Sequence, residues 1–574
     1  MGTCVGGATG TRSLKIDAEG NRSPSRFWNF RKRQYERGNA HRNDEPRELA
    51  CIFSRTATQR RAFALDASIE KVLEAVAARA SEQLKFTQPE LSAGTLRKLA
   101  RLLPLLVGVL AVVAIFNAYS SFALCTIAVL PAAFRLLIVG CGSWSAGIQK
   151  TRGDIASDEG LPIYSIILPL RREAKVIDQL LSAIERLDYP AAKLDVIVVV
   201  EEDEPETRAA VTTRKHSVPL IVIPAPPTGP RTKPKALNIA LEFARGEFTV
   251  VYDAEDRPDP NQLRRAIEGF RASGNDLACL QARLCIDTNT NWLARYFAAE
   301  YAGQFDIFLP KLAAFGLPLP LGGSSNHFRT ATLREVNKWD AYNVTEDADL
   351  GMRLARYGYR CGVIDSTTYE EAPTKVYDWL RQRSRWLKGW MQTWLVHMRN
   401  PFNFFRQLGF SGFLTFQLVI GGNALVALVH PLFLIVLVWN WAGSSPAGHF
   451  QPTHALVAAG FGYLVSASLG FLGLWQRGML NRAPVLLLTP LYWVLLSAAA
   501  WWAALEIVFA PSWWNKTEHG LDCPAQIDSL TSALLRLDRH ITELMQRGEI
   551  PQIWIDATNN AANPRLRPRV AVSG

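Results

Sequence analysis

The chain contains two long apolar stretches, at residues 102–139 and roughly 410–508, that enclose a segment of ordinary polarity at 150–405. A helix needs about 20 consecutive apolar residues to cross the hydrocarbon core of a bilayer, and both stretches exceed that length. A chain within the bilayer must satisfy its own backbone hydrogen bonds, which favours helices there. The sequence therefore predicts a multipass membrane protein that carries a separate α/β domain.

The apolar stretches predict several crossings. Residues 101–140 are too long for one span and contain a polar break at 117–121, so two transmembrane helices are expected there. Residues 406–510 contain three further candidates, at 410–441, 455–475 and 483–509. Lys and Arg favour the cytosolic side, and three full crossings would leave the basic C-terminus outside. We therefore expect the third candidate to be re-entrant or interfacial, or the first to hold two passes.

The ends of the chain are basic. The net charge is +11, and Lys and Arg gather in residues 1–100 and at the extreme C-terminus. The first 60 residues are polar and aperiodic, which predicts partial disorder, whereas residues 66–86 have helical spacing. A basic tail beside membrane spans is expected to face the anionic cytoplasmic leaflet rather than a nucleic acid. The 8 cysteines show no spacing typical of a zinc site.

Between the apolar stretches, short apolar runs alternate with helical patterns. The clearest strand is Leu194–Val200, a β-branched run typical of a strand buried on both faces of a parallel sheet. The other predicted strands lie at 164–170, 220–223, 248–252 and 277–281, with helices at 173–187, 234–245 and 260–272. This order predicts a Rossmann-like, mostly parallel sheet over residues 150–405. Ligands of such sheets bind beyond the carboxyl ends of the strands.

Acidic residues follow two of these strands at their carboxyl ends, at 201–203 and at 253–256. Alternate positions of an extended loop point the same way, so Asp253 and Glu255 are expected to share a face. Their hard oxygens suit Mg²⁺ or Mn²⁺, and such a metal neutralises a diphosphate that has to depart. An acidic triplet alone is a weak signal, and its place after a strand strengthens it.

Two motifs 35 residues apart follow: Thr345–Asp347 and Gln382–Trp386. Acidic residues in a first helical turn also complement the helix dipole, which accounts for Glu346, while Asp347 is interpreted as a general base for an attacking hydroxyl. A helix is predicted from about Val376 to Met398.

The second motif offers two kinds of contact. Arg383 and Arg385 suit bidentate contacts to a diphosphate, and Trp386 offers an aromatic face to a sugar ring. The tryptophans at 379 and 394 are interpreted as packing residues of the same helix.

Together these residues resemble the D, D, D, QxxRW pattern of the family 2 processive glycosyltransferases, which include cellulose, curdlan, chitin, hyaluronan and poly-N-acetylglucosamine synthases. The resemblance covers roughly residues 160–400 and the flanking membrane segments. It implies a GT-A fold, with Asp347 as the catalytic base and a metal at Asp253 and Glu255. The nucleotide and donor contacts that it implies are Asp203, Glu202, Lys235, Asn238, Asp253, Arg383, Arg385 and Lys516. The implied acceptor contacts are Gln382, Trp386, Gly323 and Glu346.

Two departures and one further element qualify the resemblance. The metal triplet reads Asp-Ala-Glu instead of Asp-x-Asp, and the first acidic cluster has Glu202 as an alternative to Asp203. Residues 511–574 contain Trp514–His519, which is similar to the family's element that closes over the nucleotide after the last membrane segment. That role requires a cytosolic C-terminal segment.

The resulting prediction is a membrane-embedded inverting transferase that moves a hexose from a UDP-sugar to a growing β-glycan. Its catalytic domain is expected to face the cytosol from the cytoplasmic (inner) membrane, and export or regulatory subunits are conceivable partners. One alternative is a non-processive enzyme that glycosylates a lipid such as diacylglycerol. Another is a non-catalytic receptor or assembly subunit on the same fold. The donor sugar and the linkage are not readable from these residues.

Overall fold

The computed structural model describes residues 67–114, 118–141, 148–149, 158–441, 452–511 and 513. The start of the chain, predicted to be partly disordered, lies outside these residues, as do Lys516 and the rest of Trp514–His519.

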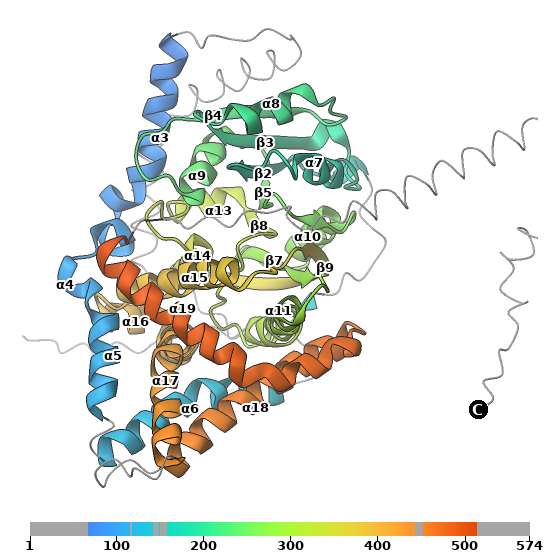
Figure 1. Cartoon of the computed structure of the whole chain (residues 1–574). Coiled ribbons are helices and arrows are strands. Elements are labelled where there is room, and N and C mark those ends of the chain that lie inside the picture. The colour runs from blue at the N-terminus through green and yellow to red at the C-terminus, as the bar shows by residue number, and fades with distance from the viewer. Residues whose placement is uncertain are drawn as a thin grey trace, which may run out of the picture. The chain divides into compact units, whose positions relative to one another are not determined.

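A mixed, mostly parallel sheet forms the centre of the α/β domain (Figure 1). The nine described strands run in the order β1-β9-β7-β8-β5-β2-β3-β4, with β6 paired to β9. The pairings of β8 with β5 and β7 and of β6 with β9 are antiparallel. The strands are β1 Ile148–Gln149, β2 Tyr164–Leu170, β3 Leu194–Glu201, β4 Leu220–Ala225, β5 Phe248–Val251, β6 Arg257–Pro258, β7 Leu277–Ile286, β8 Asn326–Arg329 and β9 Arg360–Glu370. The predicted α/β sheet is confirmed.

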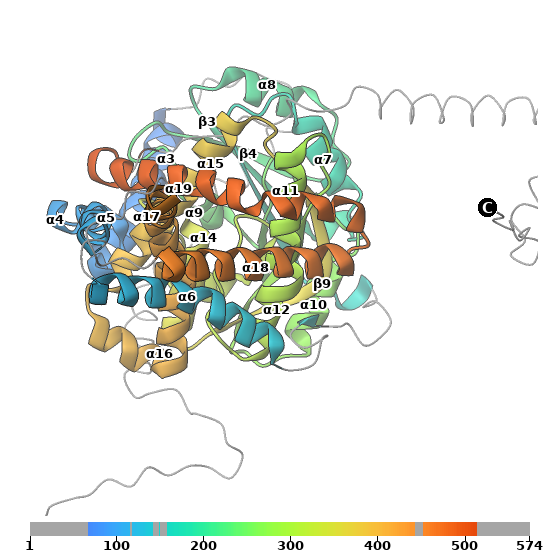
Figure 2. The same ribbon diagram turned by 60° about the horizontal axis from the view of Figure 1, so that its bottom comes forward.

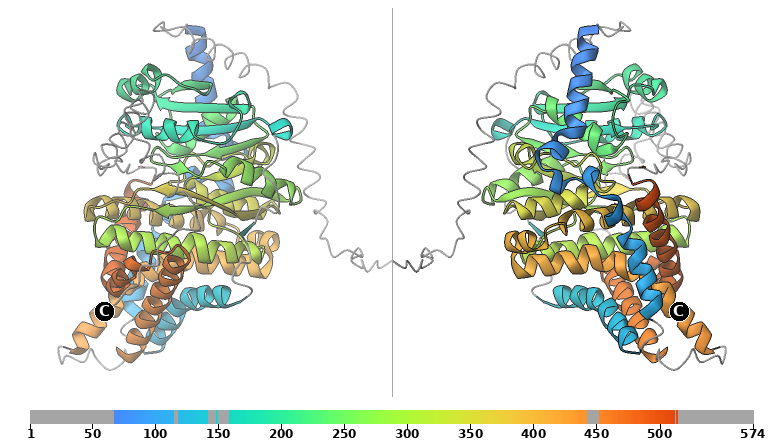
Figure 3. Two further views of the ribbon diagram at one scale, coloured as in Figure 1. Left: turned by 90° about the vertical axis from the view of Figure 1, so that its right-hand side faces the viewer. Right: turned by 90° about the vertical axis from the view of Figure 1, so that its left-hand side faces the viewer.

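Helices cover both faces of this sheet (Figure 3). They are α3 Ala67–Thr87, α7 Ile177–Glu185, α8 Pro205–Thr213, α9 Lys233–Phe243, α10 Gln262–Arg271, α11 Trp292–Ala302, α12 Leu309–Ala314, α13 Thr330–Glu335, α14 Glu346–Arg356 and α15 Val376–His397. A π-helix, η5 Gly303–Phe308, continues α11 into α12. Two of them carry the motifs, since α14 begins within Thr345–Asp347 and α15 contains Gln382–Trp386.

Strands β2 and β3 are neighbouring inner strands of the sheet, and they are buried on both faces. All residues of β3 are buried, and Tyr164 of β2 pairs with Leu194 of β3. Successive side chains of a strand point to opposite faces. Accordingly, Ile197 packs in the cluster that contains α3 and α9, and Val198 packs in the cluster that contains α7 and α10.

Four of the described stretches are long and apolar enough to cross a membrane, judged by length and composition: Phe122–Gly140, Pro401–Val438, Thr453–Gln476 and Leu480–Phe509. The helices that contain them are α6 Ala118–Gly140, α16 Pro401–Phe416, α17 Gly422–Trp441, α18 Pro452–Gln476 and α19 Thr489–Phe509. A π-helix at Gln417–Gly421 joins α16 to α17, and a 3-10 helix at Leu480–Leu488 precedes α19.

Two helices, α5 Leu103–Ala114 and α6, occupy the region of the two spans predicted at 101–140. Residues 115–117 between them lie outside the described part of the chain, and α6 contains one of the candidate spans. Residues 410–441 form one helical run, and Gly409 introduces a kink with its positive φ of 69°. Residues 489–509 form one continuous helix rather than a re-entrant turn.

The membrane helices pack directly on the α/β domain. Helices α6 and α18 lie side by side (Figure 2), and α18 also crosses α11 and η5. The backbones of α18 and α11 approach closely at this crossing: a Cβ at Gly473 would lie 2.3 Å from the Ala302 carbonyl carbon. Small residues allow such backbone approach. Helix α19 packs along α15, with Ala499 and Ala503 in one cluster with Leu387 and Met391.

Candidate active site

A cavity of about 380 Å³ lies between the carboxyl ends of the central strands, the helices α11 and α15, and the membrane helices. Its lining brings together the predicted site residues Asp253, Glu255, Gly323, Glu346, Asp347, Gln382, Arg383, Arg385 and Trp386. The other predicted residues within the described ranges, Glu202, Asp203, Lys235 and Asn238, are absent from the lining. Residues from four separate segments therefore meet in one chamber.

The loop after β5 presents Asp253 to this chamber. The Asp253 amide donates a hydrogen bond of 2.6 Å to Oδ2 of the buried Asp256, which fixes the turn. Lys233, at the start of α9, places Nζ 2.5 Å from Asp253 Oδ1 and donates a hydrogen bond of 2.7 Å to the Gly323 carbonyl. Lys233 was not predicted, although its segment was singled out for Lys235. The Lys233 ammonium offsets part of the negative charge of Asp253.

Negative charge is in excess around Asp253. Burial raises the pKa of Asp256 and of Glu370 well above the ordinary carboxyl range, and the charges of Asp253 and Glu255 add to both shifts. Burial lowers the pKa of Lys233, but the charges of Asp253 and Glu346 outweigh it, so that the ammonium stays protonated. Such a cluster favours the binding of a further cation.

Asp253 and Glu255 fit a divalent metal that a substrate helps to coordinate. The described residues contain no group of three or more His, Cys, Asp or Glu side chains able to hold a metal by themselves. Mg²⁺ is commonly held by one or two carboxylates together with substrate phosphates, so two carboxylates in a chamber are sufficient. The Asp253 side chain is 31% exposed to that chamber.

The acidic cluster after β3 contributes a different residue from those predicted. Glu201 is buried and lines the chamber, and burial raises the pKa of its carboxyl. Glu202 and Asp203 are exposed. Asp203 forms an ion pair of 2.5 Å with Arg231, whose hydrogen bond lowers the pKa of that carboxyl.

Lys235 and Asn238 are bound to the backbone of neighbouring loops. Lys235 Nζ donates to the carbonyls of Pro226 and Thr228. The Asn238 amide donates to the Ala80 and Trp339 carbonyls, at 2.9 Å each. In this conformation Asn238 joins α3 to the loop before Thr345–Asp347, and it stands outside the chamber.

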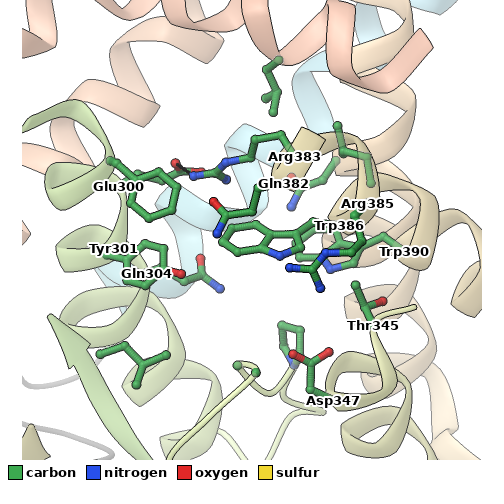
Figure 4. Close-up of a pocket in the computed structure, with 18 of the residues that line it drawn as sticks. Glu300, Tyr301, Gln304, Thr345, Asp347, Gln382, Arg383, Arg385, Trp386 and Trp390 are labelled. Carbon is green, nitrogen blue, oxygen red and sulfur yellow. Dashed lines mark hydrogen bonds and ion pairs between the residues drawn. The ribbon is translucent and has the colours of Figure 1, made fainter. Parts of the chain in front are cut away.

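Asp347 lies in the first turn of α14 and faces the Asp253 side of the chamber. A Cβ at Gly323 would lie 3.4 Å from Asp347 Oδ2 and 3.8 Å from Asp253 Oδ2, so Gly323 leaves open the space between the two carboxylates. Burial raises the pKa of Asp347, and burial together with the charge of Asp347 raises the pKa of Glu346 to about 8. In Figure 4 the Arg385 guanidinium points from α15 towards Asp347. Arg385 thereby offsets part of the charge of Asp347.

Helix α15 also holds the loop that precedes α14 and Asp347. Asn343 donates a hydrogen bond of 3.0 Å to Thr393, and the Val344 amide donates one of 3.3 Å to Gln392. Gly389 permits the close approach, because a Cβ there would lie 2.2 Å from Thr345 Oγ1. The helix that carries Gln382–Trp386 therefore packs directly against Thr345 through residues that follow this motif.

Deeper in α14, Asp349 forms a buried ion pair of 3.2 Å with Arg353 and accepts a hydrogen bond of 3.1 Å from His397 at the end of α15. These contacts fix the first turns of α14 against the far end of α15.

Arg383 and Arg385 face different walls of the chamber. Its guanidinium donates a hydrogen bond of 2.9 Å to Glu300 of α11 and one of 3.0 Å to Tyr492 of α19. It is sandwiched between the rings of Phe297 and Trp386, each 4.6 Å from the guanidinium carbon. Figure 4 shows this pair reaching across the chamber from α11 to α15. No sequence motif identified Glu300.

Gln382, Trp386 and two residues of the α11–η5 segment surround the open space above Asp347. Tyr301 and Gln304 face Trp386 across this space in Figure 4. Within the described part of the chain, Gln382 Oε1 is buried without a hydrogen-bond partner. A buried acceptor atom of this kind is costly unless a ligand supplies the donor. The arrangement suits a hydroxylated acceptor that lies on Trp386.

Two models of glycosyltransferase families match this chain. Residues 165–330 match the model of Glycosyl transferase family 2, and residues 248–510 match that of Glycosyl transferase family group 2. The probable glycosyltransferase YdaM of Bacillus subtilis is 27% identical over 305 residues, which cover 49% of this chain and 71% of that protein.

Two further relatives have more specific names. The beta-monoglucosyldiacylglycerol synthase of Synechocystis is 25% identical over 286 residues, 48% of this chain and 59% of that protein. The probable glucomannan 4-beta-mannosyltransferase 1 of Arabidopsis thaliana is 25% identical over 259 residues, 44% of this chain and 45% of that protein. The matched segment thus spans about half the length of these two relatives.

Among solved structures, a mannosyltransferase from Pyrobaculum calidifontis in complex with GDP-Man and Mn²⁺ aligns over 64% of this chain and 99% of that chain, with 21% sequence identity and a TM-score of 0.41. Residues 165–510 thus match models of family 2 glycosyltransferases, and the α/β domain has a GT-A-like fold.

Proposed function

Because the chain carries family 2 glycosyltransferase domains, we propose that it is an inverting, metal-dependent hexosyltransferase that uses a UDP-sugar and acts on a membrane-associated acceptor. The observation that carries the proposal is the placement of Asp347 and Asp253 on either side of the space that Gly323 leaves open. A sugar in that space has its leaving group near Asp253 and its attacked carbon near Asp347.

The donor end of the chamber binds the diphosphate. Lys233 and Arg385 supply positive charge to the phosphate oxygens, and Asp253 and Glu255 would hold Mg²⁺ or Mn²⁺. When bound, that metal stabilises the negative charge that develops on the departing diphosphate. Glu201, at the end of β3, lies on the nucleotide side and takes the place predicted for Glu202 or Asp203.

Asp347 is the proposed general base. Its carboxylate accepts the proton of the acceptor hydroxyl as the hydroxyl oxygen forms a bond to the anomeric carbon. The bond between that carbon and the phosphate oxygen breaks on the opposite side, and UDP departs with the electron pair. A single displacement of this kind inverts the anomeric configuration, so an α-linked donor gives a β-linked product.

The acceptor lies on the α11–α15 side of the chamber. Gln382 Oε1 can accept a hydrogen bond from a substrate hydroxyl, and Trp386 and Tyr301 can pack against the apolar face of a sugar or a headgroup. The sequence predicted a growing β-glycan as acceptor, with a lipid as the alternative. The relatives include both a glycolipid synthase and a glucomannan mannosyltransferase by name.

The test uses the purified full chain in detergent with Mg²⁺ or Mn²⁺ and a membrane-lipid extract that contains acceptors. Release of UDP is measured for each UDP-sugar in turn. We expect one donor to be used, and Asp347→Asn to lower kcat by about 10³-fold, within the range for loss of a general base. Asp178→Asn is the matched control, since the Asp178 side chain is 89% exposed on α7. Turnover of no donor, or equal turnover by Asp347→Asn and the wild type, contradicts the proposal.

A further inference from the structure

The chamber continues beyond the catalytic residues into the membrane helices. Its lining includes Ala128 of α6, Val426 and Phe433 of α17, Ala459 of α18 and Leu496 of α19. Each of these residues belongs to a stretch that is long and apolar enough to cross a membrane. One continuous space therefore joins Asp347 to the interior of the helix bundle, and we call its part between α6, α17, α18 and α19 the inner pocket.

The two ends of the space differ in chemistry. The catalytic end carries Asp253, Asp347 and Arg385, whereas the inner pocket is lined mostly by small and aliphatic side chains. A ligand that fills both ends must be polar at one end and apolar at the other.

The polar side chains of the inner pocket are already bound to one another. Both ring nitrogens of His430 are engaged, with the Ser497 hydroxyl at 2.9 Å and with the Tyr463 hydroxyl at 2.6 Å. Arg135 donates a hydrogen bond of 3.3 Å to Asn423 and lies over a phenylalanine ring of the π-helix η5. Apart from the other N–H groups of Arg135, the pocket thus offers mainly apolar contact to a ligand.

A chain of sugars would bind unfavourably in the inner pocket. Every sugar carries several hydroxyl groups, and a hydroxyl buried without a hydrogen-bond partner is destabilised. A hydrocarbon chain needs no such partner, and close contact with alanine, valine and leucine suits it. The Arg383–Glu300 pair, which reaches across the chamber in Figure 4, marks where the catalytic end passes into the inner pocket.

We propose that the acceptor is a lipid, whose hydroxylated head reaches Asp347 and whose hydrocarbon chain occupies the inner pocket. This inference rests on the proposed function and names the acceptor class of the same site. It favours transfer to a membrane lipid over extension of a glycan through the helix bundle.

The first experiment is photolabelling, which does not depend on turnover. The full-length protein in nanodiscs is incubated with a diacylglycerol that carries a diazirine near the end of one acyl chain, irradiated and digested, and the labelled residues are mapped by mass spectrometry. We expect label on the segments around Val426 and Ala459, in the wild type and in Asp347→Asn alike. Excess unlabelled diacylglycerol should remove this label. Label confined to bilayer-facing positions such as Leu456 and Leu464, which are 60% and 65% exposed, overturns the proposal.

The second experiment fills the inner pocket. Ala459 is 5% exposed and lines the pocket, whereas Leu464, on the same helix α18, is 65% exposed. Ala459→Phe should reduce the label and the rate of transfer to dioleoylglycerol by about tenfold or more, as when a pocket loses the room for a ligand group. Leu464→Phe, the matched control, should change neither. Thermal unfolding and size-exclusion chromatography establish that both variants fold, and if Ala459→Phe does not, the labelling map of the wild type decides the question.

The results separate this inference from the proposed function. A wild type that releases no UDP from any donor contradicts the proposed function, while its labelling map still tests the pocket. A wild type that releases UDP but makes high-mass, β-glycosidase-sensitive product, with no label in the inner pocket, overturns the lipid acceptor and leaves the transferase in place. A product that is soluble in organic solvent and sensitive to Ala459→Phe supports the inference.

Discussion

Replacing Gly389 by alanine should impair catalysis without touching a catalytic group. Gly389 is buried on α15, where an added Cβ would lie 2.2 Å from Thr345 Oγ1 and 2.5 Å from its Cγ2. Ordinary van der Waals contact begins at 3.4 Å, so one of the two backbones must move by about 1 Å. The Asn343–Thr393 and Val344–Gln392 hydrogen bonds hold the loop to the same helix, and they prevent it from simply moving away.

The displacement should reach Asp347, which follows Thr345 by two residues. A misplacement of about 1 Å in a reacting group can cost about 10²-fold in rate, which corresponds to roughly 2.7 kcal/mol of transition-state stabilisation. We therefore expect kcat to fall by about 10²-fold. The KM for the donor should change less than kcat, because two of the proposed donor contacts, Asp253 and Lys233, lie on other elements than α15.

The assay is UDP release from the donor that the wild type uses, with kcat and KM measured separately. Gly460→Ala is the control, since nothing lies within 4 Å of a Cβ at Gly460 on α18. Thr345→Ala removes the two atoms nearest the new methyl, so it should restore part of the kcat of Gly389→Ala when the two are combined. A folded Gly389→Ala protein with the kcat of the wild type would refute the reasoning that this contact positions Asp347.

Three other perturbations test the chamber. Gly323→Val should lower kcat/KM for the donor by about 10²-fold, because the valine side chain fills the space for the sugar. Thermal stability should change little, since the Cβ meets Asp347 Oδ2 at an ordinary contact distance of 3.4 Å. A normal KM and kcat would place the sugar elsewhere. Activity should fall as the pH decreases through the pKa of Asp347, which burial raises, because only the ionised carboxylate accepts a proton; a kcat/KM profile whose acid limb lies at the ordinary aspartate value would contradict this. Chelation of divalent metal should abolish UDP release and Mn²⁺ should restore it, with Asp253→Asn needing more Mn²⁺ for half-maximal rate; full activity in the chelator would exclude the metal.

The sequence predicted the strands whose side chains are apolar on both faces. Strand β2 coincides with the predicted 164–170, and β3 extends the predicted run by one residue to Glu201. Strand β8, Asn326–Arg329, was missed because its four residues show neither alternation nor a β-branched run. Its antiparallel place between β5 and β7 is determined by pairing with strands that are distant in sequence, which local propensity does not report.

The site was predictable where function follows from position at a strand end, and less so where a side chain depends on tertiary partners. Asp253 follows β5 and reaches the chamber, as the rule for parallel sheets predicts. After β3, the same rule identifies the segment but not the residue that reaches the chamber. A shift of one residue along the chain turns a side chain from the chamber towards solvent. Glu201 faces inward, and Asp203 faces Arg231. Lys233 and Lys235 differ in the same way on the first turn of α9.

The two arginines of Gln382–Trp386 point in different directions, and helix geometry alone could have predicted this. Successive residues of an α-helix turn by about 100°, so positions two apart point in nearly opposite directions and do not face a common ligand. Arg383 and Arg385 were both assigned to a diphosphate. On α15 the latter points towards Asp347, and the former points towards Glu300 and Tyr492 at the entrance to the membrane helices. In the proposed mechanism diphosphate binding therefore falls to Arg385 and Lys233, while Arg383 links α11 to α19 through Glu300 and Tyr492. Its removal should therefore disturb the acceptor more than the donor, since Glu300, whose side chain is 35% exposed, would lose its ion-pair partner beside the acceptor and keep only the Tyr492 hydroxyl.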